Sequence, residues 1–190
     1  MGAFSFPAIG NESNEMHASD GQAATLTVRA ARAGDADAIA AFNAAMALET
    51  EGKRLLPQVI AAGVRRLLAE PALGFYLVAE AGGALAGCLM VTTEWSDWRN
   101  GRFWWIQSVY VPPQWRRRGV FRALYRHVQE AARAQPDVCG LRLYVERENA
   151  GAQATYRSLG MAQTHYLLFE QLAPGVVYLQ EDGAQPSSSG

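Results

Sequence analysis

Three consecutive arginines followed by a glycine, residues 116–119, form the most distinctive chemical pattern in the sequence. A strand-like run ends before them at two prolines and a helical apolar pattern follows them, so they fall at a helix N-terminus. Cations there oppose the helix dipole, at a cost of roughly 0.3–1 kcal/mol each. A bound polyanion offsets this cost, because backbone N–H and guanidinium groups both hold phosphate and Gly119 allows close approach. The pattern indicates a phosphate site, with a solvated basic turn as the alternative.

The turn before the arginines reads VPPQW at residues 111–115, and the loop itself reads RRRGVF at residues 116–121. Neither GxxxxGK[ST] nor a GxGxxG after a strand occurs, which excludes two other phosphate loops. The arrangement resembles motif A of the GNAT (Gcn-related N-acetyltransferase) superfamily, bacterial type. In that motif a strand and a V-x-P turn precede R/Q-x-x-G-x-G/A at the start of a helix. Phe121 departs from the motif, which usually has Gly or Ala there.

A second pattern lies downstream, where NAGAQATY at residues 149–156 is followed by LGM at residues 159–161. Taken alone, Asn149 is typical of a helix N-cap and Gly160 of a helix C-cap. Together they are similar to the N-x-x-A-x-x-x-Y-x-x-x-G-F motif of the same superfamily. Two motifs in the family's order, separated by one strand, extend the resemblance over about residues 26–172.

The resemblance implies acetyl-CoA as the acetyl donor and no metal. The backbone of residues 109–111 would pair with the pantetheine arm, and the amides of residues 117–122 would hold the pyrophosphate. Asn149 would contact the CoA arm, and Tyr156 would stand near the sulfur as general acid for the leaving thiolate. The cofactor-binding residues implied are Val109, Tyr110, Val111, Arg116, Arg117, Arg118, Gly119, Val120, Phe121, Arg122, Asn149 and Tyr156.

The resemblance does not supply the general base, because many GNAT enzymes carry Glu on the motif A strand where this chain has Gln107. Glutamine cannot accept a proton, so the base is a carboxylate elsewhere or a relayed water. The candidates are Glu49, Glu51, Glu94 and Asp97, of which we take Glu94 as catalytic.

Large aromatic residues beside carboxylates indicate the acceptor side, in EWSDW at residues 94–98. Carboxylates and aromatic faces both attract a cationic amine. In the GNAT fold the segment between the first two helices commonly lines the acceptor site. The alternatives are that some tryptophans cover the end of the sheet and that the glutamates form a solvated helix end. The acceptor-binding residues expected are Glu49, Glu51, Asp97, Trp98 and Gln107.

The order of elements predicts an α/β (α+β) GNAT fold, with one mixed, mostly antiparallel sheet of about six to seven strands and about four helices. Asp35 is expected to cap the first helix, Pro57 to start the second, and Asn149 to cap the last. The long helix after the arginines is expected over about residues 118–134. Strands are expected at residues 26–31, 75–80, 85–93, 103–111, 141–146, 161–170 and 176–180.

Length and composition bound the remaining possibilities. The 190 residues suit one domain, expected at residues 25–180 between a flexible arm (1–24) and a flexible tail (181–190). A formal net charge of −1 argues against nucleic-acid binding, and no long apolar run predicts a membrane span. The two cysteines form no disulfide framework, which favours a cytoplasmic setting. The resemblance also implies that a homodimer is possible, because members of the family often form homodimers.

The function that these observations favour is acetyl transfer from acetyl-CoA to a primary amine of a small molecule or amino-acid-like acceptor, by direct attack in a ternary complex. A protein N-terminal or lysine acetyltransferase is one alternative. A non-catalytic acyl-CoA-binding regulatory module is another, which Gln107 motivates. The plainest alternative is an α/β domain whose basic loop binds no CoA.

Overall fold

The computed structural model describes residues 12–14 and 25–180. These described residues fall into two compact units, the first running up to Arg142 and resuming at Tyr178, and the second comprising Leu143–Val177. The arm expected at residues 1–24 lies outside the described residues except for 12–14, and the tail expected at 181–190 lies wholly outside them.

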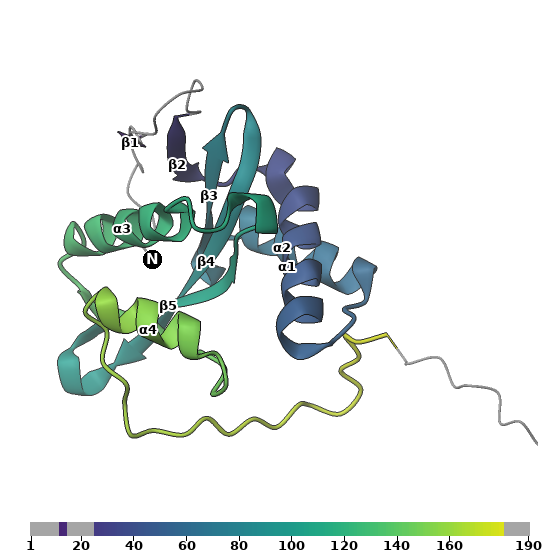
Figure 1. Ribbon diagram of the computed structural model, residues 1–190. Helices are drawn as coiled ribbons and strands as arrows, with labels where there is room; N and C mark the ends of the chain where they lie inside the picture. Colours follow the sequence, from purple (N-terminus) through teal and green to yellow (C-terminus); the bar gives the residue numbers. More distant parts are fainter. Residues whose placement is uncertain (1–11, 15–24, 181–190) are drawn as a thin grey trace, which may run out of the picture. The chain divides into compact units, whose positions relative to one another are not determined.

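A six-stranded sheet in the order β1-β2-β3-β4-β5-β6 forms the centre of the fold (Figure 1). Neighbouring strands from β1 to β5 are antiparallel. β6 runs parallel to β5, because Gly101 lies beside Cys139 and Phe103 beside Gly140. The predicted fold class, a mixed and mostly antiparallel sheet with four helices, is therefore confirmed. The strands are β1 Glu12–Asn14, β2 Leu26–Ala30, β3 Phe75–Ala81, β4 Ala84–Ser96, β5 Gly101–Tyr110 and β6 Val138–Leu143.

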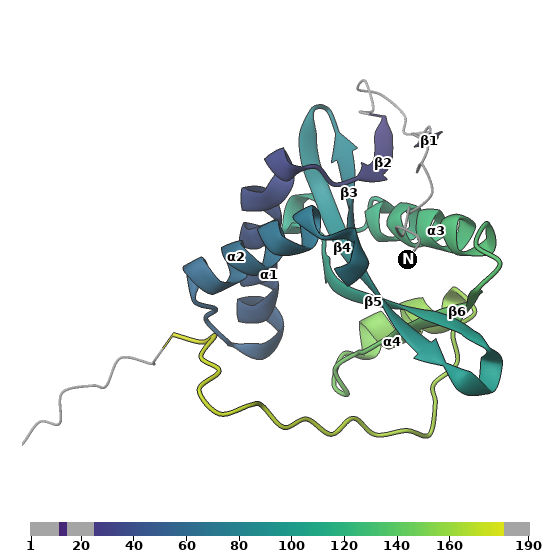
Figure 2. The ribbon, with the colours of Figure 1, turned by 180° about the vertical axis from the view of Figure 1, so that it is seen from behind.

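Helices cover both faces of this sheet. α1 (Ala36–Glu51) and α2 (Pro57–Ala69) lie on one face and α3 (Val120–Arg133) on the other, as Figures 1 and 2 show together. Alternation along β4 explains this arrangement. Cys88 packs in the core cluster of α1 and α2, whereas its neighbour Gly87 faces Val120 of α3. The fourth helix, α4 (Ala150–Ser158), belongs to the second unit.

Two apolar layers result from this alternation. Ile39 of α1 and Val64 of α2 are buried against Tyr76 and Val78 of β3. Leu124 of α3 is fully buried on the opposite side. Each such side chain contributes roughly 1.5–3 kcal/mol through burial, so the two layers fix the sheet on which the site is built.

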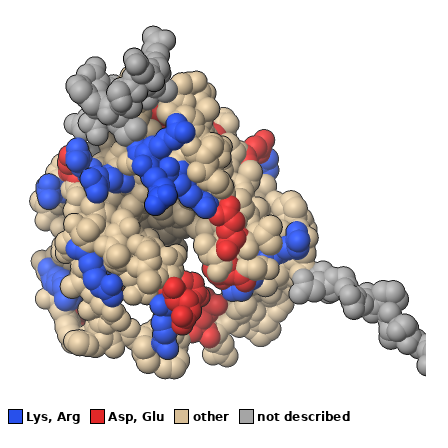
Figure 3. Space-filling view, in the orientation of Figure 1, with Lys and Arg blue, Asp and Glu red and all other residues tan. Residues whose placement is uncertain are grey.

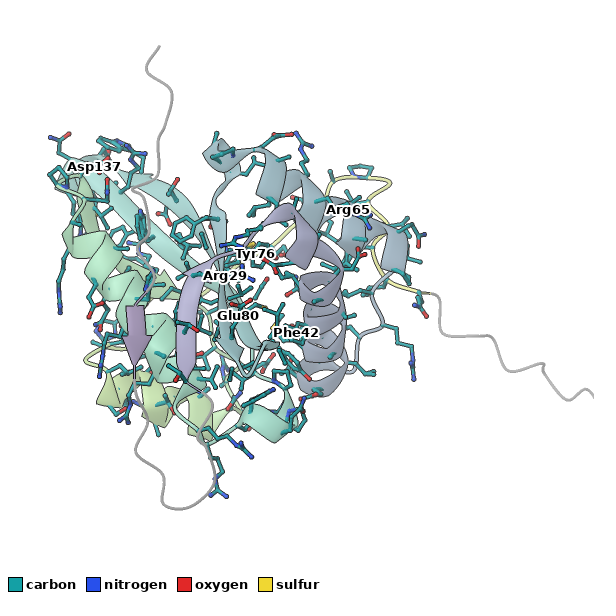
Figure 4. The ribbon with its side chains drawn as sticks, turned by 90° about the horizontal axis from the view of Figure 1, so that it is seen from above. Arg29, Phe42, Arg65, Tyr76, Glu80 and Asp137 are labelled. Atoms are coloured by element: carbon teal, nitrogen blue, oxygen red, sulfur yellow. The ribbon has the colours of Figure 1, made fainter. Side chains whose placement is uncertain are left out.

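The signals predicted for the helix starts are largely confirmed. Pro57 occupies the first turn of α2, and the Asn149 side chain accepts a hydrogen bond from the Ala152 amide at 3.0 Å. Asp35 directly precedes α1, but its carboxylate accepts hydrogen bonds from the Arg29 guanidinium and the Arg32 amide. Arg29 also pairs with Glu80 of β3, so one partly buried guanidinium ties β2 to β3 and to the start of α1 (Figure 4).

Four strand predictions differ from the structure. β4 continues to Ser96 because Glu94 to Ser96 pair with Gly101 to Phe103, so Glu94 and Trp95 lie in a strand rather than in a loop. β6 covers Val138–Leu143 rather than 141–146. The strands predicted at 161–170 and 176–180 are wrong, apart from an isolated bridge between Leu55 and Leu179. Alternating apolar residues make a strand only where a sheet edge pairs with them.

Candidate active site

The predicted pantetheine-binding strand contains a β-bulge. Cys88 lies opposite Tyr110 and Met90 opposite Gln107, so the two residues Ser108 and Val109 face a single residue of β4. Ser108 has a φ of 48°, in the left-handed region. A bulge leaves its extra residue outside the ladder and twists the strand. The strand edge is thus interrupted at Val109, where the sequence predicts contact with an extended ligand.

Buried polar groups hold this bulge in place. The Asn43 side chain of α1 donates a hydrogen bond to the Tyr76 hydroxyl at 3.0 Å, and that hydroxyl also hydrogen-bonds with Ser108. Burial raises the pKa of Tyr76, and these two hydrogen bonds act against the increase. The Cys88 thiol donates to the Ser108 carbonyl, and burial raises the pKa of this thiol to about 12, so it stays protonated. Figure 4 shows Tyr76 in the interior, beside the helix α1 that carries Phe42.

The arginine loop follows the bulge and leads into α3. A short turn at Pro113–Trp115 directs the chain into residues 116–119, where Arg117 has a φ of 62° and Gly119 a φ of 78°. Gly119 is the N-cap of α3, and no side chain of the described residues caps that N-terminus. The first turn of a helix has amides without intrahelical acceptors, and left-handed residues beside it bend further amides inward. This backbone forms a cradle for an anion.

Positive charge gathers over the same loop. Figure 3 shows basic side chains where β5 ends and α3 begins, beside acidic side chains over α1. Arg116, Arg117 and Arg118 are exposed, and the Arg118 guanidinium lies 5.4 Å from the centre of the Trp115 ring. Arg116 pairs with Glu49, whereas Arg117 and Arg118 form no ion pair with any described residue. The cradle therefore offers two guanidinium groups as well as amides, which fits a pyrophosphate.

A glycine on β4 lets α3 begin so close to the sheet. A Cβ on Gly87 would lie 2.9 Å from the Tyr110 carbonyl oxygen and 3.1 Å from Cγ1 of Val120. Such contacts are closer than packed carbon atoms tolerate. Gly87 thus positions the N-terminus of α3 against the end of β5, where the bulge lies.

The predicted acceptor residues of β4 and β5 share one face of the sheet. Gln107 donates a hydrogen bond from Nε2 to the Thr92 hydroxyl at 2.7 Å. Further along, Oε1 of Glu94 accepts a hydrogen bond from Arg142 of β6 at 2.7 Å, and Oε2 accepts one from the Trp105 indole. The registers of Thr92 with Trp105 and of Glu94 with Phe103 place these groups in one row.

The other candidate carboxylates also have partners. Glu49 accepts a hydrogen bond from the Tyr110 hydroxyl at 2.6 Å and pairs with Arg116. Glu51 pairs with Lys53 at 2.6 Å, and Asp97 accepts a hydrogen bond from the Trp98 amide at 2.8 Å. Each of the four carboxylates considered from the sequence is thus already engaged by a cation or an amide.

The tryptophans divide between core and surface. Trp104 is buried and packs edge-on against Phe75, with 5.3 Å between ring centres, so it covers the sheet. Trp95 and Trp98 are 57% and 85% exposed. The exposed pair lies at the β4–β5 turn, next to Asp97.

A cavity of about 350 Å³ opens between α1 and α2. Its walls are largely apolar and include Ala40, Ala44 and Ile60, with Arg54 and Gln180 at the margin. None of the site residues expected from the sequence lines it. This cavity is therefore not formed by the residues that the two motifs single out.

The model of the Acetyltransferase (GNAT) family matches residues 42–161, which include both motifs. The chain belongs to the GNAT acetyltransferase family. A possible acetyltransferase from Clostridium difficile 630 is 43% identical, with a TM-score of 0.73 over 78% of this chain and 97% of that one. None of the curated proteins matches the chain.

Two more distant structures share the fold alone. An aminoglycoside N-acetyltransferase in complex with CoA is 16% identical, with a TM-score of 0.64 over 82% of this chain and 99% of that one. Glucosamine-6-phosphate N-acetyltransferase from Arabidopsis thaliana is also 16% identical, with a TM-score of 0.60 over 78% of this chain and 99% of that one. GNAT enzymes use acetyl-CoA, which fits the anion cradle described above.

The second GNAT motif lies on α4, in the second unit. Asn149 caps this helix, so its carbonyl oxygen is engaged with the Ala152 amide. Tyr156 is half-buried, and burial raises the pKa of its hydroxyl. The hydroxyl therefore stays protonated at neutral pH, as a proton donor must.

Sequence reasoning missed several residues that shape the site. Asn43 gave a signal, as a polar residue on the apolar side of a helix, but Ser108 and Arg142 gave none, because a bulge and a cross-strand ion pair depend on the assembled sheet. Over residues 12–14 and 25–180, no group of three or more His, Cys, Asp or Glu is arranged to hold a metal. Over the same residues, no helix is long and apolar enough to cross a membrane.

Proposed function

We propose that this chain transfers the acetyl group of acetyl-CoA to a primary amine of a small molecule or amino-acid-like acceptor, by direct attack in a ternary complex. The observation that carries this proposal is the cradle at α3, where left-handed Gly119 opens an uncapped helix N-terminus beside exposed Arg117 and Arg118. A cradle of amides and guanidinium groups supports binding of a pyrophosphate, and family membership supports the acetyl donor.

The cofactor contacts follow the chain from β5 into α3. In the proposal, the amides of residues 117–122 bind the pyrophosphate, and Arg117 and Arg118 neutralise its charge. Val109 to Val111 offer backbone groups to the pantetheine arm, where the bulge interrupts pairing with β4.

Acetyl transfer needs a neutral amine, a polarised thioester carbonyl and a proton for the leaving thiolate. We assign the last role to Tyr156, whose raised pKa keeps the hydroxyl protonated. Before the attack, the ammonium form of the acceptor gives a proton to Glu94 or to a relayed water, and the neutral amine then attacks the thioester carbonyl. Gln107 cannot take it, because its amide is neutral and donates to Thr92.

The acceptor is assigned to the exposed end of the β4–β5 hairpin. Asp97 and Trp98 lie there, and Glu94 lies on the same strand. Their carboxylates and aromatic faces favour a cationic amine. A non-catalytic acyl-CoA-binding module is the second candidate, since Gln107 stands where a proton acceptor is usual.

A thiol-release assay over a panel of amines tests the proposal. The panel contains small amines, amino acids and short peptides with free N-termini or lysines. We expect CoA release with one class of small amine. Turnover on peptides alone would indicate a protein acetyltransferase, and acetyl-CoA binding without turnover on any amine would indicate a binding module.

A further inference from the structure

A carboxylate of α1 joins the end of β5 to the start of the arginine loop. Oε1 of Glu49 accepts a hydrogen bond from the Tyr110 hydroxyl at 2.6 Å, and Oε2 pairs with the guanidinium of Arg116. We call these three residues the Glu49 clamp. Tyr110 and Arg116 lie 61 and 67 positions after Glu49 in the sequence, so the clamp links elements that only the fold brings together.

Other contacts fix both partners of Glu49. The Arg116 Nε donates to the Val111 carbonyl at 2.9 Å, and its Cζ lies 5.8 Å from the centre of the Tyr110 ring. The Tyr110 ring is buried and packs against Phe42 of α1, with 5.5 Å between ring centres. The turn from β5 into the arginine loop is thus held from the side of α1.

In the Glu49 clamp, the charges of Glu49 and Arg116 are paired with each other. Both oxygens of Glu49 are occupied, and the hydrogen bonds from Tyr110 and Arg116 lower the pKa of its carboxyl. These contacts direct the charge of Glu49 to the end of β5 and the start of the arginine loop, whereas the acceptor is assigned to the opposite end of β5, at the β4–β5 turn. Arg116 is engaged as well, which leaves the phosphate to its neighbours Arg117 and Arg118.

We propose that Glu49 is a positioning residue for the acetyl-CoA site, which holds the arginine loop in place through Arg116 and Tyr110 and does not bind the acceptor. This inference rests on the proposed function. The side chains of Arg116 and Glu49 are 46% and 38% exposed, so the ion pair adds little to the stability of the fold. Its consequence is geometric, because small displacements of binding groups weaken a site strongly.

Three variants test the clamp. Glu49→Ala removes both contacts, whereas Glu49→Gln keeps an oxygen for Tyr110 and loses the ion pair. Glu51→Gln is the matched control, because Glu51 lies at the same helix end and pairs only locally with Lys53. We expect Glu49→Ala to raise the Kd and KM for acetyl-CoA at least about tenfold, with an unchanged acceptor KM. For the Kd and KM of acetyl-CoA, Glu49→Gln should lie between Glu49→Ala and the wild type, and Glu51→Gln should keep the wild-type values.

A second measurement does not depend on the cofactor. Trypsin cleaves after arginine, so cleavage after residues 116–118, mapped by mass spectrometry, reports how firmly the loop is held. We expect faster cleavage there in Glu49→Ala than in Glu51→Gln, with nearly unchanged Tm. Unchanged cleavage would overturn the clamp. A higher acceptor KM with an unchanged acetyl-CoA KM would instead make Glu49 an acceptor ligand.

Failure of the proposed function gives a different result. In that case the wild-type protein binds no acetyl-CoA, while the cleavage difference between Glu49→Ala and Glu51→Gln still decides whether the clamp holds the loop.

Discussion

The carboxylate of Glu94 in β4 lies against the guanidinium of Arg142 in β6, with 2.7 Å between Oε1 and Nη1. The Arg142 guanidinium also stacks on Phe103, with 3.7 Å from Cζ to the ring centre, and the Trp105 indole donates to the second oxygen of Glu94. The three strands β4, β5 and β6 therefore fix the orientation of this carboxylate. A fixed carboxylate suits both acceptor binding and proton transfer, and the kinetic consequences of the two roles differ.

Charge removal at Glu94 and Asp97 tests the placement of the acceptor. We expect the variant Glu94→Gln with Asp97→Asn to raise the acceptor KM more than the acetyl-CoA KM, because both carboxylates attract a cationic amine. If Glu94 is also the base, kcat falls as well. Equal effects on both KM values would place the acceptor elsewhere.

Arg142→Gln is the control for this experiment, since it leaves the carboxylate of Glu94 in place and removes its partner. We expect an acceptor KM that is unchanged or lower, because the negative charge is then less compensated. An increase as large as that of Glu94→Gln would mean that Glu94 acts through Arg142 and not on the amine.

Gly119→Val tests the phosphate cradle. Gly119 has a φ of 78°, where a β-branched side chain costs roughly 1–3 kcal/mol and crowds the approach of the phosphates. We expect the affinity for acetyl-CoA to fall by more than about tenfold, measured by calorimetry. Gly83→Val is the control. Gly83 has the same φ of 78° in the β3–β4 turn, and a Cβ added there would meet no atom within 4 Å, so this variant introduces the backbone strain without changing the cradle. Equal affinity losses in both variants would refute the assignment.

Tyr156→Phe separates catalysis from binding. If Tyr156 protonates the leaving thiolate, we expect kcat to fall at least about tenfold with an unchanged Kd for acetyl-CoA, a modest effect because a CoA thiolate leaves readily. The wild-type rate should also decline at high pH, above the ordinary pKa of a tyrosine, because burial raises the pKa of this hydroxyl. An unchanged kcat in the variant would remove Tyr156 from the chemistry.

Arg29→Met tests the buried ion pairs at the start of α1. Arg29 is 11% exposed, and its hydrogen bonds lower the pKa values of Asp35 and Glu80. The stabilisation is therefore present above the ordinary pKa values of these carboxyls, 3.8 and 4.5, and is lost as the pH falls through their lower folded-state values. We expect the variant to lose about 2 kcal/mol at pH 7, since charged hydrogen bonds are removed from a partly buried site, and to show a weaker pH dependence between pH 5 and 2 in urea unfolding.

The control for Arg29→Met is Arg65→Met. Arg65 pairs with Asp37, and these side chains are 60% and 84% exposed, so the free energy of unfolding should change by less than about 1 kcal/mol. Figure 4 shows Arg65 on α2, away from the position of Arg29. Similar losses in the two variants would contradict the account of the buried pair.

Local signals in the sequence predicted much of the fold. Pro57 and Asn149 act at the helix starts where they were expected, because capping depends on a few neighbouring residues. β6 and the end of β4 were misplaced, because cross-strand pairing decides where a strand stops. The predicted late strand at 161–170 has the right period, but no described strand pairs with it.

The position of the arginine loop in the fold was predictable as well. The loop with Gly119 lies at the start of α3, since a motif of adjacent residues specifies it. The partners of the carboxylates were not predictable. Arg116 and Arg142 reach Glu49 and Glu94 from 67 and 48 positions away, and no local pattern records such pairs.

A thermal-shift titration with acetyl-CoA tests the central claim most directly, with Gly119→Val measured alongside the wild type. A ligand at 100 times its Kd stabilises the folded state by about 2.7 kcal/mol, which raises the Tm measurably. We predict a saturable increase in the Tm of the wild-type protein and little or no increase in the variant. No shift of the wild-type Tm at any concentration of acetyl-CoA would contradict the account.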